Sequence, residues 1–359
     1  MQDRRFKLKF TLWLVIAALL IAYFAHRLDW VEVKESFRHL NLWLAAGSVL
    51  PILATYVVRA LRWRAFLAPM ARPSFRNLFA ATVVGFSSIF IFGRVGEVAR
   101  PVMLSLRERI RPSATLATIM IERLYDSMFV ILLFAIDLTF FERFINEGDL
   151  TAIRQVGFGL LILSGLGIIV LSVYRWRVNT ILGFLEKKLP WVPEKLRRVL
   201  LNFLRHLADG LYVLHDARGF LITLGYTVLV WGLVTLSFWL VVRAFGLTLS
   251  LLSIVFILGF ALVGSLIPTP GGSAGAFHTA TMIALTLLGV ERNAAASTAI
   301  GMHLVGFGSA LLFGVYFFLR DGISLKDLRA MIAEEMLSED MLDPSASQHT
   351  ETQVIGVKS

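Results

Sequence analysis

Six charged residues between positions 94 and 126 lie inside or beside apolar segments, and they are the strongest candidates for binding chemistry. Three belong to Gly93-Arg-Val-Gly-Glu-Val-Ala-Arg-Pro101, which interrupts an apolar run, and three lie roughly two turns into the next predicted helix. The six residues are Arg94, Glu97, Arg100, Glu122, Arg123 and Asp126. The arginines could bind an anionic headgroup, and the carboxylates could hold the arginines in place or bind a cationic group.

The apolar surroundings make these charges costly. Charged residues within a hydrocarbon region are rare, usually pair or face a cavity, and usually serve a function. Glu122 and Asp126 are four residues apart, so they share one face of a helix, with Arg123 adjacent. A simpler structural interpretation stays open, in which Arg94 and Arg100 anchor the membrane edge and Glu122 neutralises one of them.

A second set of candidates offers backbone groups and histidines instead of fixed charge. The sequence 268–278 reads Pro-Thr-Pro-Gly-Gly-Ser-Ala-Gly-Ala-Phe-His and interrupts the apolar stretch 251–288. Free N–H groups at the start of the second half helix could face an anion such as phosphate. The residues concerned are Gly271, Gly272 and Ser273. A tight turn that only permits helix packing is the structural alternative.

Two histidines are candidates for proton exchange. His278 directly follows the second break, and His303 lies roughly two turns into the following helix. An unperturbed histidine titrates near pH 6.5, where it can exchange a proton under physiological conditions. Buried histidines that hydrogen-bond to backbone carbonyls are the simpler interpretation of both residues.

The composition predicts an all-α polytopic membrane protein. Of 359 residues, 57% are hydrophobic and 17% are charged, and the mean hydropathy is +0.73. Several long apolar runs account for this value. The net charge of +10 does not indicate a nucleic-acid partner, because the basic residues lie in short loops beside apolar runs.

No catalytic residues, cofactor or metal are expected. The chain has no cysteine, which excludes disulfides and thiolate chemistry. Its sequence shows no spacing of His, Asp and Glu typical of a metal site, and neither break matches a nucleotide-binding P-loop. The chain is therefore not expected to be an enzyme.

Hydropathy and charge predict about six full transmembrane helices and two interrupted segments. The full helices are expected at about 10–25, 42–58, 113–138, 156–173, 220–242 and 294–319. The interrupted segments cover about 77–107 and 251–289. Basic clusters flank both ends of the first segment, whereas the second has one charge in the loop before it and no net charge after it. Each is therefore expected to be a re-entrant helical hairpin, and the two enter from opposite sides.

Each predicted hairpin is followed by a full helix, which indicates an inverted repeat. Inverted repeats meet at a midplane site and permit alternating access by rocking of one unit against the other. We expect residues 1–320 to form a single transmembrane domain with both termini in the cytoplasm. Residues 174–219 are expected to form a cytoplasmic amphipathic loop, and residues 321–359 a partly disordered cytoplasmic tail.

Four motifs together resemble the lysylphosphatidylglycerol synthase transmembrane family, also called the flippase-like family. They are Arg59-Ala-Leu-Arg-Trp63, Gly93-Arg-Val-Gly-Glu-Val-Ala-Arg-Pro101, Glu122-Arg-Leu-Tyr-Asp126 and Pro270-Gly-Gly-Ser-Ala-Gly275. Family members more often carry a glutamate after the aromatic residue of the last motif. Here His278 follows Phe277, so this position offers no carboxylate for a coupling role.

The resemblance implies lipid translocation. Fused members of the family move aminoacylated phosphatidylglycerol between leaflets, while a soluble domain makes this lipid. The present sequence has no such soluble domain, so translocation alone is implied. Other members that consist of the membrane domain alone are associated with export of glycolipids, hopanoids or polyprenyl-linked sugars.

The sequence therefore predicts a lipid translocase, or flippase, of the bacterial inner membrane. Its substrate would be a membrane lipid with an anionic or zwitterionic headgroup, and a lipid-modifying enzyme and a second copy of the chain are candidate partners. One alternative is an intramembrane transferase that acts on a lipid phosphate with His278 or His303 as base. Another is a non-catalytic scaffold recruited through the basic amphipathic helix at about 196–211.

Overall fold

The computed structural model describes most of the chain. It covers residues 18–26, 28–140, 176–188, 217–265, 267 and 270–321, with residue 15 and scattered positions between 155 and 207. The described residues are mainly helical and include no β-strand, which confirms the all-α class. The predicted tail after residue 321 lies outside the described residues, as do parts of the predicted helices at 10–25 and 156–173 and much of the basic segment 196–211.

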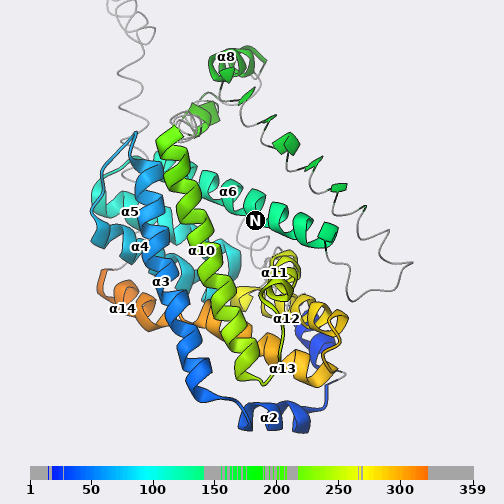
Figure 1. The fold of residues 1–359 in the computed structure, drawn as a ribbon. Coiled ribbons are helices and arrows are strands. Elements are labelled where there is room, and N and C mark those ends of the chain that lie inside the picture. The colour runs from blue at the N-terminus through cyan, green and yellow to red at the C-terminus, as the bar shows by residue number, and fades with distance from the viewer. Residues whose placement is uncertain are drawn as a thin grey trace, which may run out of the picture.

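Short connections join the helices from α2 to α6 and from α10 to α14 (Figure 1). Their bounds are α2 Trp30–Arg38, α3 Leu42–Leu67, α4 Phe75–Phe92, the 3₁₀ helix η1 Gly93–Val98, α5 Ala99–Glu108, α6 Pro112–Phe140, α8 Val178–Lys188, α10 Ala217–Ala244, α11 Leu251–Ser265, α12 Pro270–Leu287, α13 Arg292–His303, the π-helical turn η3 Leu304–Gly308 and α14 Leu311–Asp321.

Three of the described helices are long and apolar enough to cross a membrane. They cover Leu42–Leu67, Arg218–Ala244 and Arg292–Phe317. Helix α6 has 29 residues, but Glu122, Arg123 and Asp126 in its first half lower its hydropathy. The chain is therefore a multi-pass membrane protein.

Helices α3 and α10 lie side by side and antiparallel (Figure 1). The start of α3 meets the end of α10, where the Asn41 N–H donates to the Ala244 carbonyl. Further along, the Ser237 hydroxyl donates to the Ser48 carbonyl over 2.7 Å. Helix α3 ends at Leu67, so the predicted end near residue 58 is wrong. Arg59, Arg62 and Arg64, which follow residue 58 in the sequence, are therefore part of α3.

Helices α4 and α5 form an antiparallel hairpin whose two ends lie together. At the turn, a Cβ atom at Gly85 would lie 2.7 Å from Arg100 Cβ, so glycine permits the close approach of the two helices. At the other end, the Arg107 guanidinium donates to the side-chain oxygen of Asn77 over 3.3 Å. The 3₁₀ helix η1 makes the reversal between α4 and α5.

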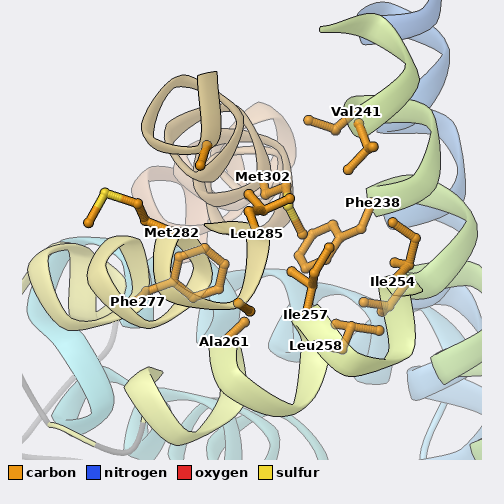
Figure 2. Packing of buried hydrophobic residues seen from close by; sticks show 14 of the residues in the cluster. Phe238, Val241, Ile254, Ile257, Leu258, Ala261, Phe277, Met282, Leu285 and Met302 are labelled. Carbon is orange, nitrogen blue, oxygen red and sulfur yellow. The ribbon is translucent and has the colours of Figure 1, made fainter. Parts of the chain in front are cut away.

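Helices α11 and α12 form a second hairpin. Gly264 of α11 faces Ala276 and Ala280 of α12 at distances that leave no room for a Cβ atom. The connection is closed by the Ser273 hydroxyl, which donates to the Ile267 carbonyl over 2.7 Å. Large apolar side chains of α10 to α13 pack around this hairpin (Figure 2). They include Phe238, Ile257, Phe277, Leu285 and Met302.

The two hairpins are connected through the last helices. The π-helical turn η3 joins α13 to α14, and α14 packs against α4. There the Ser87 hydroxyl donates to the Ala310 carbonyl over 2.8 Å, and Gly314 lies directly against Ser87. Helix α12 also contacts both α4 and η1. The breaks of the two hairpins are thus brought into the same part of the fold.

Candidate functional site

Glu122 of α6 is the centre of a buried group of ion pairs. Its Oε1 atom lies 2.8 Å from Arg100 Nη1, 3.1 Å from Arg62 Nη2 and 3.0 Å from Arg123 Nη2. The side chains of Glu122 and Arg62 are fully buried, and that of Arg100 is 2% exposed. These arginines come from α3, α5 and α6, so one carboxylate oxygen connects three helices.

Asp126, one turn further along α6, completes the arrangement. Both of its oxygens bind Arg62, with distances of 2.7 Å to Nη1 and 3.0 Å to Nη2. The Trp231 indole N–H also donates to Oδ1 over 3.2 Å, and Arg59 Nη1 lies 3.5 Å from Oδ2. A bidentate pair of this kind fixes the plane of the guanidinium group as well as its charge. Helices α3, α6 and α10 are therefore held at this point by polar contacts.

Glu97 in η1 connects the first break to this arrangement. Its Oε1 atom lies 3.0 Å from Arg123 Nε, and the two side chains are 21% and 30% exposed. This pair is the most exposed part of the arrangement. The side chain of Arg94, which was also predicted to contribute, lies outside the described residues.

We call these seven side chains the charge cluster. Its members are Arg59, Arg62, Glu97, Arg100, Glu122, Arg123 and Asp126. Four arginines face three carboxylates, so the charge cluster carries one net positive charge. In surroundings of low dielectric constant, such an excess of positive charge strongly favours the binding of an anion.

The excess of hydrogen-bond donors is most evident at Arg100. Its Nη1 atom donates to Glu122, whereas its Nε and Nη2 atoms are buried without a hydrogen-bond partner among the described residues. These two N–H groups form one edge of the planar guanidinium, which is the geometry that binds two oxygens of a carboxylate or phosphate. The Trp63 ring packs on the guanidinium at 4.2 Å from its centroid and holds its plane.

One acceptor of the charge cluster is also free. The Oε2 atom of Glu122 is buried without a hydrogen-bond partner in the described part of the chain. The same carboxylate holds Arg100 through its other oxygen. The charge cluster therefore offers a double N–H donor and, through the adjoining carboxylate, an unused oxygen acceptor.

The second break is formed by unusual backbone conformation. Gly271, Gly272 and Ser273 have φ values of 72°, 61° and 64°, all in the left-handed region. The carbonyl of Gly272 lies 3.2 Å from His303 Nε2. A Cβ atom at Gly272 would lie 3.3 Å from this nitrogen and 3.2 Å from the Phe307 ring. Glycine is required there both for the backbone angle and for the close approach.

His278 and His303 form a pair beside this break. Their ring centroids are 4.7 Å apart, and the Phe24 ring covers His278 at 5.0 Å. His278 Nε2 is buried without a hydrogen-bond partner among the described residues. Phe90, at the end of α4, lies 6.0 Å from His303. The histidine pair thus borders the first hairpin as well as the second.

The structure gathers most of the predicted residues into two neighbouring groups. Five of them belong to the charge cluster, namely Glu97, Arg100, Glu122, Arg123 and Asp126. The other described residues lie at the second break, namely Gly271, Gly272, Ser273, His278 and His303. The two groups are linked by η1, which contains Glu97 and contacts α12.

Sequence reasoning missed Arg59 and Arg62 as site residues, because basic residues beside an apolar run usually indicate a membrane edge. Both are buried, whereas Arg64 on the same helix is exposed. A signal was present: the two arginines are three residues apart and therefore share a helix face, and Trp63 adjoins them. Arginines that only anchor a helix end need no such common face.

The comparison with known proteins assigns the chain to a family. No curated protein sequence matches it. The sequence model of the lysylphosphatidylglycerol synthase TM region matches residues 10–314. This range contains the charge cluster, the second break and the histidine pair. The chain belongs to the lysylphosphatidylglycerol synthase TM region family.

Proposed function

We propose that the protein is a lipid translocase that moves a lipid with a phosphate-bearing headgroup across the bacterial inner membrane. Family membership supports a lipid-related function in a membrane. The observation that carries the proposal is the free edge of Arg100 within a buried cluster of net positive charge. The proposed translocation involves no covalent step, and neither catalytic residues nor a cofactor are required.

The free N–H groups of Arg100 favour a phosphate. Burial of a charged donor without a partner is costly, and a bound oxyanion would satisfy Nε and Nη2 together. One phosphodiester charge would balance the net charge of the charge cluster. Glu122 Oε2 would accept a hydrogen bond from a hydroxyl or ammonium group of the same headgroup. Both anionic and zwitterionic lipids suit this arrangement.

The two hairpins support a mechanism of alternating access. In each, the second helix packs back against the first, and in the α4–α5 hairpin the outer ends also lie together. We propose that both hairpins are re-entrant, that they enter from opposite sides and that they form an inverted repeat within six full crossings. Both termini would then be cytoplasmic. The headgroup would pass along the charge cluster while the lipid tails stay in the bilayer.

A translocation assay in proteoliposomes tests this function. The substrate is a fluorescent phosphatidylglycerol, whose exposure in the outer leaflet is followed by chemical quenching. Arg100→Lys keeps the charge but loses the planar pair of donors. We expect this variant to slow transport by about tenfold or more, since hydrogen bonds to charged groups contribute about 1.5–3 kcal/mol. Arg64→Lys, at an exposed position of α3, should transport at the wild-type rate.

Two results would contradict the proposal. One is a folded Arg100→Lys protein that transports as fast as wild type. The other is formation of a modified lipid by the detergent-solubilised protein, without two compartments, because this would indicate the transferase alternative. Thermal unfolding of each purified variant separates loss of function from loss of fold.

A further inference from the structure

The histidine pair has features that the lipid site does not require. Neither ring hydrogen-bonds to the charge cluster among the described contacts, and both lie between aromatic side chains. His303 adjoins Phe277 and Phe307 at centroid distances of 5.2 and 5.0 Å, and His278 adjoins Phe24. Two titratable groups enclosed by apolar rings need an explanation of their own.

We propose that His278 and His303 form a proton site that couples lipid translocation to proton movement across the membrane. This inference rests on the proposed lipid translocation. The ring centroids are 4.7 Å apart, so the pair can hold one added proton but not two without strong repulsion. One proton would therefore move with each transport cycle.

The hydrogen bonds show how a proton could change the conformation. The Gly272 carbonyl can only accept, so His303 Nε2 donates to it. His278 Nε2 is buried and has no partner among the described residues. If His278 takes up a proton, both of its ring nitrogens become donors, and the present packing offers Nε2 no acceptor. The break must then shift to provide one.

The backbone at the break is suited to such a shift. Ser273 has a φ of 64° without being glycine, a conformation that stores strain. The π-helical turn η3 begins directly after His303, and such turns are frequent at functional sites. Protonation of the histidine pair and rearrangement of α12 against α13 would then be thermodynamically coupled.

No fixed charge of the neighbouring described helices faces the pair. Helix α11 contains no charged residue, and the charges of α4 and α13 are limited to the exposed Arg76 and Arg292 in their first turns. The helix over 18–25, which covers Gly275, contains no charged residue either. In η1, Glu97 is paired with Arg123, and the side chain of Arg94 lies outside the described residues. The pair would therefore respond mainly to protons and to the position of the break.

Proteoliposomes loaded with a pH-sensitive dye test this coupling. An imposed pH difference should distribute fluorescent phosphatidylglycerol unequally between the leaflets, by about tenfold per pH unit at equilibrium for one proton per lipid. Proton flux should also rise when that lipid is added to vesicles that otherwise contain phosphatidylcholine. His278→Gln should lose the unequal distribution and the lipid-dependent flux. His39→Gln, at an exposed position of the short loop after α2, should behave as wild type.

The outcomes separate this inference from the lipid function. Wild-type protein that equilibrates lipid without lipid-dependent proton flux would overturn the coupling and leave translocation intact. Wild-type protein that does not move lipid at all would overturn both. Folded His278→Gln that keeps full coupling would exclude the histidine pair as the proton site. Since the wild-type measurements decide coupling without a variant, a misfolded variant does not prevent the test.

Discussion

The two hairpins break their helices by different physical means. In the α4–α5 hairpin the break is stabilised by charge, since Glu97 and Arg100 both pair with residues of α6. In the α11–α12 hairpin it is stabilised by backbone geometry, with three successive left-handed residues beside a histidine pair. The first break is therefore suited to hold a charged headgroup, and the second is suited to change shape. A transport cycle needs both properties.

The largest expected effect concerns Glu122, the α6 carboxylate at the centre of the charge cluster. Glu122→Gln keeps the shape of the side chain but leaves Arg62, Arg100 and Arg123 without their shared anion. Removal of one partner from a buried ion pair costs about 3–5 kcal/mol. Denaturant unfolding in detergent micelles should show a loss of this size.

Glu97→Gln is the matched control for this prediction. Glu97 binds the same Arg123, but at the partly exposed edge of the charge cluster. Pairs exposed to solvent contribute about 0–1 kcal/mol, so we expect a much smaller loss. Equal losses in the two variants would show that burial does not control the energetics of the first break.

The contribution of the second break to stability should depend on backbone geometry and packing and not on charge. Gly272→Ala must adopt a left-handed backbone and also press against Phe307 and His303 Nε2. We expect a loss of about 2–4 kcal/mol in unfolding free energy, because strain and overpacking act together. Gly271→Ala separates the two causes. Its backbone is also left-handed, but its Cβ would meet only Ala274 at an ordinary distance of 3.6 Å, so about 1 kcal/mol is expected.

Comparable losses in the two glycine variants would contradict this account of the second break. They would show that the close packing of Phe307 and His303 against the position of a Gly272 Cβ has no energetic weight. The same unfolding titration measures both proteins, and a translocation assay would then show whether transport follows stability.

The smallest expected effect is at the ends of the first hairpin. Glu108 Oε1 accepts hydrogen bonds from the Ser74 hydroxyl over 2.7 Å and from Asn77 Nδ2 over 2.6 Å. Burial raises the pKa of the Glu108 carboxyl, but the hydrogen bonds from Ser74 and Asn77 outweigh this effect and hold the pKa below its ordinary value of 4.5. A depressed carboxyl pKa contributes stability above the pKa of the unfolded chain, and this stability is lost as the pH falls through the folded value.

Glu108→Gln should therefore lower the unfolding free energy by about 1 kcal/mol at neutral pH. The difference from wild type should shrink as the pH falls below about 4.5, where the wild-type carboxyl also becomes neutral. Glu186→Gln, at an exposed position of α8, should leave the unfolding free energy at neutral pH close to that of wild type. A constant difference between Glu108→Gln and wild type at all pH values would rule out this titration.

Local patterns explain which features could be predicted from the sequence. Apolar runs and the absence of strand alternation predicted an all-α membrane protein, because both signals come from neighbouring residues. The face shared by Glu122 and Asp126 also followed from helical spacing. The role of Arg59 and Arg62 did not, because basic residues at the end of an apolar run normally indicate a membrane edge.

Long-range contacts account for what was missed. Only the tertiary structure places Arg62 against Asp126, which is 64 positions away, and only these contacts allow α3 to continue to Leu67. The pairing of the two histidines likewise requires the left-handed turn at Gly272, since His278 and His303 lie on different helices. Glycines in the sequence indicate where a helix breaks, but they do not indicate which way the chain turns at that point.

The most direct test of the central claim is the location of the lipid phosphate. Cryo-electron microscopy of the protein in nanodiscs with phosphatidylglycerol would show the headgroup and the charge cluster together. We predict a phosphorus atom within about 4 Å of Arg100 Nε and Nη2, as bidentate hydrogen bonding requires. A headgroup bound elsewhere, with the Nε and Nη2 edge of Arg100 still unoccupied, would contradict the account.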